Sequence, residues 1–104
     1  MSTDFIPHAD AAFNSWQYQL ADALFSYATA WGIPAASITQ LQNQRANWDG
    51  AYSWVTNPAT KTKARVLAKN EARKEYEKFL RGLLKQYITY NPAVSDRDRV
   101  NMGL

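Results

Sequence analysis

The chain has 104 residues, a formal net charge of +3 and no cysteine. This length fits one domain, because domains commonly run to about 100–150 residues, and it leaves little room for a second folded unit. The absence of cysteine excludes disulfide frameworks, thiol nucleophiles and cysteine-based zinc or iron–sulfur sites. Positive charge is concentrated in residues 61–85, where nine of the twelve Lys/Arg accompany three Glu, so this segment carries +6 and the remainder −3.

The first predicted helix spans about residues 10–31. Apolar residues recur there at a spacing of three or four, which keeps them on one side of a helix. They are Phe13, Trp16, Leu20, Leu24, Tyr27 and Trp31. We expect Asp10 as the cap or as an acid in the first turn, and Gly32 as the left-handed residue that stops the helix.

The second predicted helix spans about residues 37–56. Ser37 and Gln40 match a capping box, in which the two side chains satisfy each other's backbone N–H donors. The apolar stripe continues, with Arg45 at one of its positions. It consists of Ile38, Leu41, Trp48, Tyr52 and Val55. Gly50 is the weak point, because a glycine inside a helix costs roughly 1 kcal/mol relative to alanine and often marks a bend or a close helix crossing.

The third predicted helix spans about residues 58–90. Asn57 and Pro58 read as an N-cap followed by proline at the first helical position, and Asn91 before Pro92 predicts the end. The apolar face consists of Ala68, Ala72, Tyr76, Phe79, Leu83, Tyr87 and Tyr90. This helix would be about 50 Å long at 1.5 Å per residue. We therefore expect its polar, basic first turns to extend beyond the other helices.

A short helix is predicted at about residues 96–102, after a second capping box formed by Ser95 and Asp98 and before a stop at Gly103. Val94, Val100 and Met102 are expected to fold onto the bundle. Two short connections place the three long helices in up-down-up order. The predicted fold is thus an all-α antiparallel bundle in a single domain, residues 1–104.

The inventory of reactive residues argues against catalysis. The only histidine, His8, precedes the first helix, and the nearby Asp10 is assigned to the start of that helix. Glu71, Glu75 and Glu77 lie beside lysines at the spacing of exposed helical ion pairs. No Gly-rich phosphate loop or dinucleotide fingerprint occurs. We therefore expect no catalytic residue, no cofactor and no metal site.

The basic residues of the third helix allow two interpretations. One group lies opposite the apolar stripe, where a soluble helix keeps its charges. It contains Lys74, Lys78, Arg81 and Lys85. The other group, Arg65, Lys69 and Arg73, forms a line at four-residue spacing closer to the apolar side. Together they are candidates for a polyanion surface that follows a phosphate backbone. A solvated face is favoured, because no helix-turn-helix spacing or aromatic RNA-binding strand accompanies them.

Three aromatic residues lie off the stripes, namely Tyr18, Phe25 and Trp54. The other aromatic residues mostly lie on the stripes, where core packing explains them. These three either pack beneath the third helix or the C-terminal segment, or they form an exposed patch for a partner or a second copy. They are the candidate partner surface.

Several stretches of the chain resemble a family of uncharacterised bacterial proteins. They are Phe5–Trp16, Thr56–Thr60, Tyr87–Val94 and the closing Asp98–Leu104. The resemblance covers nearly the whole chain and rests on caps, turns and core aromatics. It implies an N-terminal helical-bundle module with no assigned activity, which in such proteins is often followed by a Pro/Thr-linked, β-rich region. It transfers no functional residue to this chain.

Neither a secretory signal nor a membrane-spanning segment is expected. The stretch Met1–Pro7 lacks a basic region followed by an apolar run, and no segment approaches the ~20 apolar residues needed to span a bilayer. We therefore expect a cytoplasmic protein. The sequence favours a non-enzymatic interaction or scaffold domain that binds a partner protein or a second copy of itself. Nucleic-acid or other polyanion binding along the third helix is the alternative, and no small-molecule substrate is inferred.

Overall fold

The computed structural model of the protein describes residues 5–104 and contains four helices, with no strand in this range. The helices are α1 (Asp10–Tyr27), α2 (Ala35–Thr56), α3 (Lys63–Tyr87) and α4 (Asp96–Asn101). The predicted all-α class, with three long helices and a short C-terminal one, is confirmed. Residues 1–4, part of the stretch expected to contain no targeting signal, lie outside the described residues.

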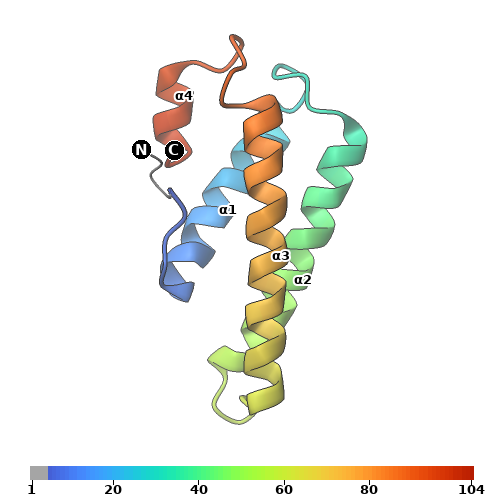
Figure 1. The fold of residues 1–104 in the computed structure, drawn as a ribbon, viewed down its shortest axis with the longest axis vertical. Coiled ribbons are helices and arrows are strands. Elements are labelled where there is room, and N and C mark those ends of the chain that lie inside the picture. Colours follow the sequence, from blue (N-terminus) through green and yellow to red (C-terminus); the bar gives the residue numbers. More distant parts are fainter. Residues whose placement is uncertain (1–4) are drawn as a thin grey trace.

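The three long helices form an up-down-up bundle (Figure 1). α2 and α3 run side by side in opposite directions, and α1 lies behind them. Asp10 contacts Lys69, and seven residues further along both helices Gln17 contacts Tyr76, so α1 and α3 run parallel. This is the helix order that the two short connections predict.

The N-terminal segment and α4 lie beside α1 and α3 (Figure 1). Val94 and Met102 are buried there, as expected, and so is Ile6. Val100, which was also expected to face the bundle, is instead 71% exposed. The reason is geometric: Val100 lies two positions before Met102, which turns it roughly 200° around the helix axis.

Local signals around α4 are confirmed. The Asp98 N–H donates to the Ser95 hydroxyl over 3.1 Å, and the Ser95 N–H donates to the Asp98 carboxylate over 3.3 Å, which is the predicted capping box. Gly103 then stops the helix with φ +78°. A Cβ at Gly103 would lie 2.9 Å from the Trp16 ring, so both the backbone conformation and the close approach require glycine.

The regular part of α1 ends at Tyr27, four residues before the predicted end. The chain continues as a turn that Gly32 closes with φ +71°. The Ile33 N–H donates to the Ala28 carbonyl over 2.8 Å, and the Gly32 N–H donates to the Thr29 carbonyl over 3.2 Å. These two bonds form a Schellman motif, so the role predicted for Gly32 is confirmed although the helix boundary is wrong.

The predicted capping box at the start of α2 is wrong. The helix begins at Ala35 with Pro34 as its N-cap, and the Ser37 N–H already donates to the Pro34 carbonyl over 3.0 Å. Alanine is the best helix former, so the two alanines before Ser37 extend the helix back to the proline. Gly50 does not mark a close helix crossing, because a Cβ there would have no neighbour within 4 Å.

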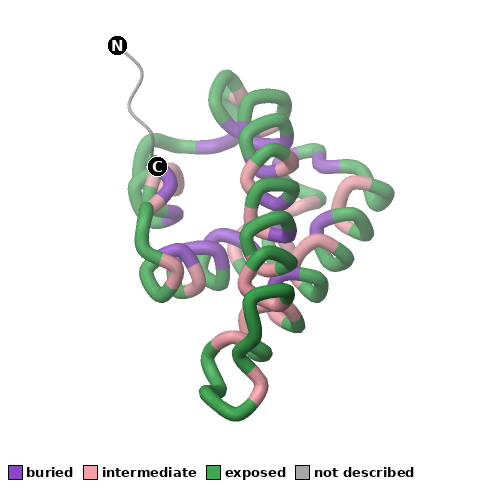
Figure 2. Tube along the Cα trace, turned by 60° about the horizontal axis from the view of Figure 1, so that its bottom comes forward, coloured by how far each residue is buried: buried purple, intermediate pink, exposed green. Residues whose placement is uncertain are grey.

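The predicted start of the third helix is also wrong. α3 begins at Lys63, and its N-cap is Thr62, whose hydroxyl accepts a backbone N–H over 3.2 Å. Asn57 and Pro58 instead form a turn, in which the Asn57 carbonyl accepts the Thr60 N–H over 3.0 Å. The tip of the α2–α3 hairpin still extends beyond α1 (Figure 1), and it is exposed (Figure 2).

The regular part of α3 ends at Tyr87, whereas the predicted end is Tyr90, which is 83% exposed. Two successive N–H groups after the helix donate to one carbonyl, that of Leu84, so the helical winding changes there. The Asn91 side chain donates to the carbonyls of Tyr87 and Trp31 over 2.8 Å each. Asn91 therefore joins the end of α3 to the turn after α1.

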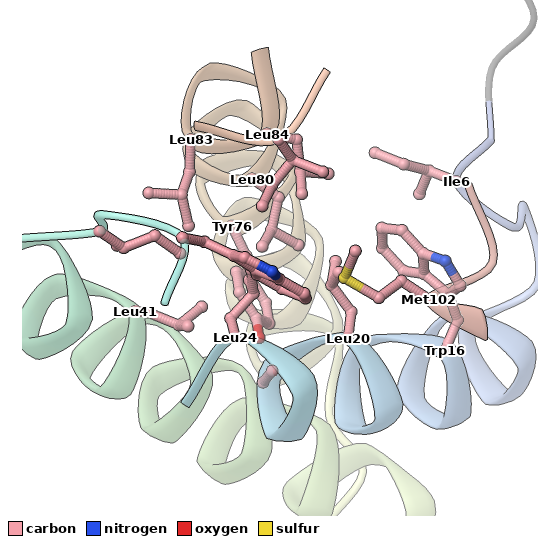
Figure 3. Close-up of a cluster of buried hydrophobic side chains, with 14 of the residues drawn as sticks. Ile6, Trp16, Leu20, Leu24, Leu41, Tyr76, Leu80, Leu83, Leu84 and Met102 are labelled. Carbon is pink, nitrogen blue, oxygen red and sulfur yellow. The ribbon is translucent and has the colours of Figure 1, made fainter. Parts of the chain in front are cut away.

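Buried side chains from the long helices meet in one core (Figure 3). The predicted stripe of α1 is buried apart from Tyr27, which is half exposed. In α2, Leu41 and Trp48 are buried and the other stripe residues are partly buried. In α3 the stripe is wider than predicted, because Leu80 and Leu84 are buried as well. Ala68 and Tyr90, the first and last residues of the predicted apolar face, are exposed.

The additional stripe of α3 has a tertiary cause. Leu80 and Leu84 face the side of the bundle that carries Ile6 and Met102 (Figure 3). A helix that packs on α1, on α2 and on a terminal segment must present apolar residues to all three. Its apolar sector is therefore broader than that of a helix with one neighbour.

A network of buried and partly buried side chains with polar groups joins all three long helices. The Trp48 indole N–H donates to the side-chain oxygen Oδ1 of Asn14 over 2.9 Å, and the side-chain amide of Gln17 donates to the same oxygen over 3.2 Å. Gln17, which is fully buried, accepts the Tyr76 hydroxyl over 2.8 Å. Burial raises the pKa of Tyr76 well above its ordinary value, so the phenol remains a donor. Satisfied buried networks of this kind specify one helix register.

Replacing Tyr76 with Phe removes the donor and leaves the buried oxygen of Gln17 without its partner. We expect the free energy of unfolding to fall by about 1–3 kcal/mol, the cost of an unsatisfied buried acceptor. Urea denaturation followed by circular dichroism measures it. Tyr90→Phe is the matched control, because Tyr90 is 83% exposed, and it should change stability by less than ~0.5 kcal/mol. Equal effects of the two variants would show that the Tyr76 hydroxyl contributes nothing specific.

Candidate interaction surfaces

Tyr18 and Phe25 lie on the seam between α1 and α2, where both approach Arg45. The Arg45 guanidinium is 3.9 Å from the centroid of the Tyr18 ring and 5.8 Å from that of Phe25. It also forms an ion pair with Asp22 at 3.2 Å. Tyr18 is 42% exposed, whereas Phe25 is partly buried and packs against the core. The structure therefore brings two of the three candidate aromatics together.

Trp54 lies elsewhere on the surface. It follows Arg45 by nine positions on α2, which corresponds to about half a rotation around the helix. Its ring is 47% exposed and is covered on one side by the Arg65 guanidinium, 3.6 Å from the ring centroid. Trp54 and Arg65 thus form a separate pair at the α2–α3 hairpin.

Four side chains on the α1–α2 seam form an electrostatic unit, which we name the Arg45 cluster: Tyr18, Asp22, Arg45 and Asp49. Burial acts to lower the pKa of Arg45, but bonds to Tyr18 and Asp22 outweigh it and raise the pKa. Burial raises the pKa of Asp49, which the positive charge of Arg45 offsets only in part. Arg45 stays ionised and offsets one of the two carboxylates beside it, so the cluster carries a net charge of −1.

The faces of α1 and α2 are poor in charge. Only four charged residues occur between positions 10 and 56, whereas sixteen occur between 61 and 104. Three of the four belong to the Arg45 cluster, and the fourth, Asp10, binds α3. Exposed positions carry small or amide side chains, for example Ala11, Ser15, Gln19, Ser26, Gln42, Asn43 and Asn47. This imbalance is readable in the sequence, and it is a signal that the search for motifs missed.

Two of the basic residues predicted as a polyanion line bind the chain itself. Lys69 forms an ion pair with Asp10 at 2.6 Å, and Arg73 forms ion pairs with Asp10 at 2.7 Å and with Glu77 at 2.8 Å. We name these four residues the Asp10 clamp. Arg73 also donates to the carbonyl oxygens of Pro7 and His8 and lies 4.4 Å from the centroid of the Phe13 ring.

The clamp holds the start of α1 against α3. Burial acts to raise the pKa of Asp10, but hydrogen bonds from Lys69 and Arg73, together with their positive charges, outweigh it and lower the pKa below its ordinary value. Arg65, the third residue of the line, covers Trp54. The line is therefore largely occupied by contacts within the chain.

The remaining candidate basic residues are exposed along α3. They are Lys74, Lys78, Arg81 and Lys85. Their spacing of three and four places them on one side of the helix. Arg81 forms an exposed ion pair with Glu77 at 3.4 Å, which is worth little in water. This basic face is separate from the seam that carries Tyr18.

His8 is exposed in the segment before α1, and its carbonyl oxygen accepts a hydrogen bond from Arg73. Among residues 5–104, no group of three or more His, Cys, Asp and Glu side chains is placed to hold a metal ion. No helix of the described part of the chain is long and apolar enough to cross a membrane. No protein-family model, curated protein or solved structure matches the chain.

Replacing Asp10 with Asn tests the clamp through its pH dependence. The folded pKa of Asp10 lies below the unfolded value of about 3.9, so its carboxylate stabilises the fold above that pH and loses this contribution as the pH falls through the folded pKa. We therefore expect Asp10→Asn to lower stability at pH 7, with a difference from wild type that shrinks towards pH 3. Urea denaturation at several pH values measures it.

Asp96→Asn is the control for this series, because the Asp96 side chain is fully exposed in its ion pair with Arg99. Its stability should follow that of the wild type at every pH. A difference between Asp10→Asn and wild type that stays constant from pH 7 to pH 3 would contradict an ionic clamp.

Proposed function

We propose that this chain is a non-enzymatic helical interaction or scaffold domain that binds protein through its α1–α2 face. One observation carries the proposal: the exposed Tyr18 ring lies in the Arg45 cluster, on a face with few charged residues whose one cation is paired within the chain.

The chemistry of this face suits a protein contact. The cores of protein interfaces are depleted in charged residues and enriched in tyrosine, tryptophan and arginine. Tyr18 is held by Arg45 on one side of its ring, so it loses little side-chain freedom when a partner covers it. Asp22 pairs with Arg45, which reduces the cost of removing either charge from water. The Trp54–Arg65 pair offers a second aromatic contact on another side of the molecule.

A second copy of this chain is the simplest partner for the α1–α2 face. In a two-fold dimer the same patch meets itself, so any unbalanced charge would meet its own sign. The basic face of α3 would suffer this repulsion from several lysines, whereas the α1–α2 face carries a single excess negative charge, in the Arg45 cluster. Self-association is therefore the first property to test.

Sedimentation across the micromolar to millimolar range should show a concentration-dependent rise in mass. Tyr18→Ala should raise the protein concentration needed for half-maximal association at least about tenfold, equivalent to ~1.4 kcal/mol. Tyr90→Ala removes another exposed tyrosine away from this face and should leave association unchanged. A wild-type chain that stays monomeric throughout would contradict self-association and leave a different protein as the partner.

Polyanion binding along α3 is the second candidate, favoured by the exposed line of basic residues from Lys74 to Lys85. If these side chains contact phosphates, affinity for a generic DNA duplex must fall as salt rises, with a slope in log–log form of about 0.9 per phosphate contacted. A double variant in which both Lys78 and Lys85 are replaced by Glu should reduce the slope of log affinity against log salt concentration. Fluorescence anisotropy on a duplex and a single strand measures it, and no binding at low salt contradicts this candidate.

A further inference from the structure

Three long helices create three grooves between neighbours, and the chain fills two of them. The N-terminal segment and α4 cover the groove between α1 and α3, where Ile6 and Met102 are buried. Tyr18, Phe25 and Arg45 cover the groove between α1 and α2. The outer groove between α2 and α3 is open. It encloses about 530 Å³, and every residue that lines it belongs to one of these two helices.

The α3 side of this open groove has an apolar strip with a bare stretch of backbone, bordered by Glu75, Lys78 and Gln86. Phe79, Leu83 and Tyr87 line it, and Gly82 lies among them. A Cβ at Gly82 would have no neighbour within 4 Å, so packing inside the chain does not require glycine there. Glycine is unfavourable in a helix interior, but it allows another backbone to approach closely. Gly82 therefore leaves room for a helix from outside.

The α2 side of the groove is polar and uncharged. It is formed by Ser37, Gln40 and Gln44. The side-chain oxygen of Gln44 is buried, and among residues 5–104 it has no hydrogen-bond partner.

One flank of the groove carries a small excess of positive charge. Lys78 lines it beside Glu75, and Lys74 and Lys85 are exposed nearby on the same helix. The part of α3 along the groove, residues 75–87, has three basic and two acidic residues, a net charge of +1. An occupant that meets this rim with acidic side chains gains favourable electrostatics and a faster encounter.

We propose that the open groove between α2 and α3 binds an acidic amphipathic helix of another protein. Its apolar ridge would pack on Phe79, Leu83 and Tyr87 over the bare backbone of Gly82, and its acidic flank would face Lys78. The groove runs along α3 from Glu75 to Tyr87, which is about 18 Å, so the bound helix has about twelve residues. Such a helix completes a four-helix arrangement.

Other occupants fit the groove less well. A second copy of this chain would bring α3 with its excess of lysines against the same lysines. A nucleic acid would follow the exposed lysines but has no use for the apolar wall. The inference goes beyond the proposed function, since it concerns a different surface, and neither depends on the other.

Two stapled helical peptides of fourteen residues serve as probes. Both carry leucines at positions i, i+3, i+7 and i+10, and their flanks carry Glu in one peptide and Lys in the other. Fluorescence anisotropy at fixed ionic strength should show the Glu peptide binding the full chain at least tenfold more tightly than the Lys peptide. Lys78→Glu should reduce the ratio of the two peptide affinities at least threefold.

Gly82→Leu fills the groove and should weaken binding of the Glu peptide at least tenfold. Its fold should be retained, because the new side chain has open space and the helix gains a better helix former. Gly50→Leu is the matched control, since Gly50 is also helical and open but does not line the groove. Circular dichroism and urea denaturation check that both variants are folded.

Failure to bind the Glu peptide, or equal binding by Gly82→Leu and Gly50→Leu, overturns the inference. The proposed function is judged separately. Tyr18→Ala should bind the Glu peptide like the wild type, and Gly82→Leu should self-associate like the wild type. A loss of peptide binding in Tyr18→Ala would place the peptide on the α1–α2 face and also overturn the inference.

Discussion

Asn14 accepts hydrogen bonds from both Trp48 and Gln17, and Gln17 in turn accepts one from Tyr76, so one buried polar chain reaches α1, α2 and α3. Apolar packing tolerates sliding between helices, but these bonds do not, because a shift of one helix would leave buried donors and acceptors unpaired. Next to this hydrogen-bonded network, the Phe13 ring packs edge-to-face on the rings of Trp48 and Tyr76. The relative positions of the three helices, and hence of every surface between them, follow from this arrangement.

The same register decides which charges remain available. It brings the start of α1 opposite Lys69 and Arg73, which therefore bind Asp10 instead of solvent or a ligand. It also brings Asp22 opposite Arg45 on the other seam. Positive charge is left mainly on the outer side of α3, while α1 and α2 present faces with few charged residues. A chain with a modest net charge thus has two chemically different sides.

The two proposals rest on these two sides. The α1–α2 face, with few charged residues and a held tyrosine, is the proposed surface for self-association or another protein. The α2–α3 groove combines an apolar strip, a glycine and a flank with a small positive excess, and it is the proposed site for an acidic helix. If both proposals hold, the domain would join two copies of itself to another protein.

Short-range physics made much of the fold predictable from the sequence. Helical periodicity located the three long helices, and the stops at Gly32 and Gly103 and the box at Ser95 depend on neighbours within a few residues. The predicted start of the third helix was wrong, because two local start signals competed: Asn57–Pro58, which forms a turn, and Thr62, which is the actual N-cap. Only the tertiary structure decided that Arg73 serves a clamp, that Leu80 belongs to the core, and that the groove beside Gly82 is open. Such contacts join residues as far as 66 positions apart, as Arg73 and Pro7 do, and no local pattern records which side chains the packed helices bring together.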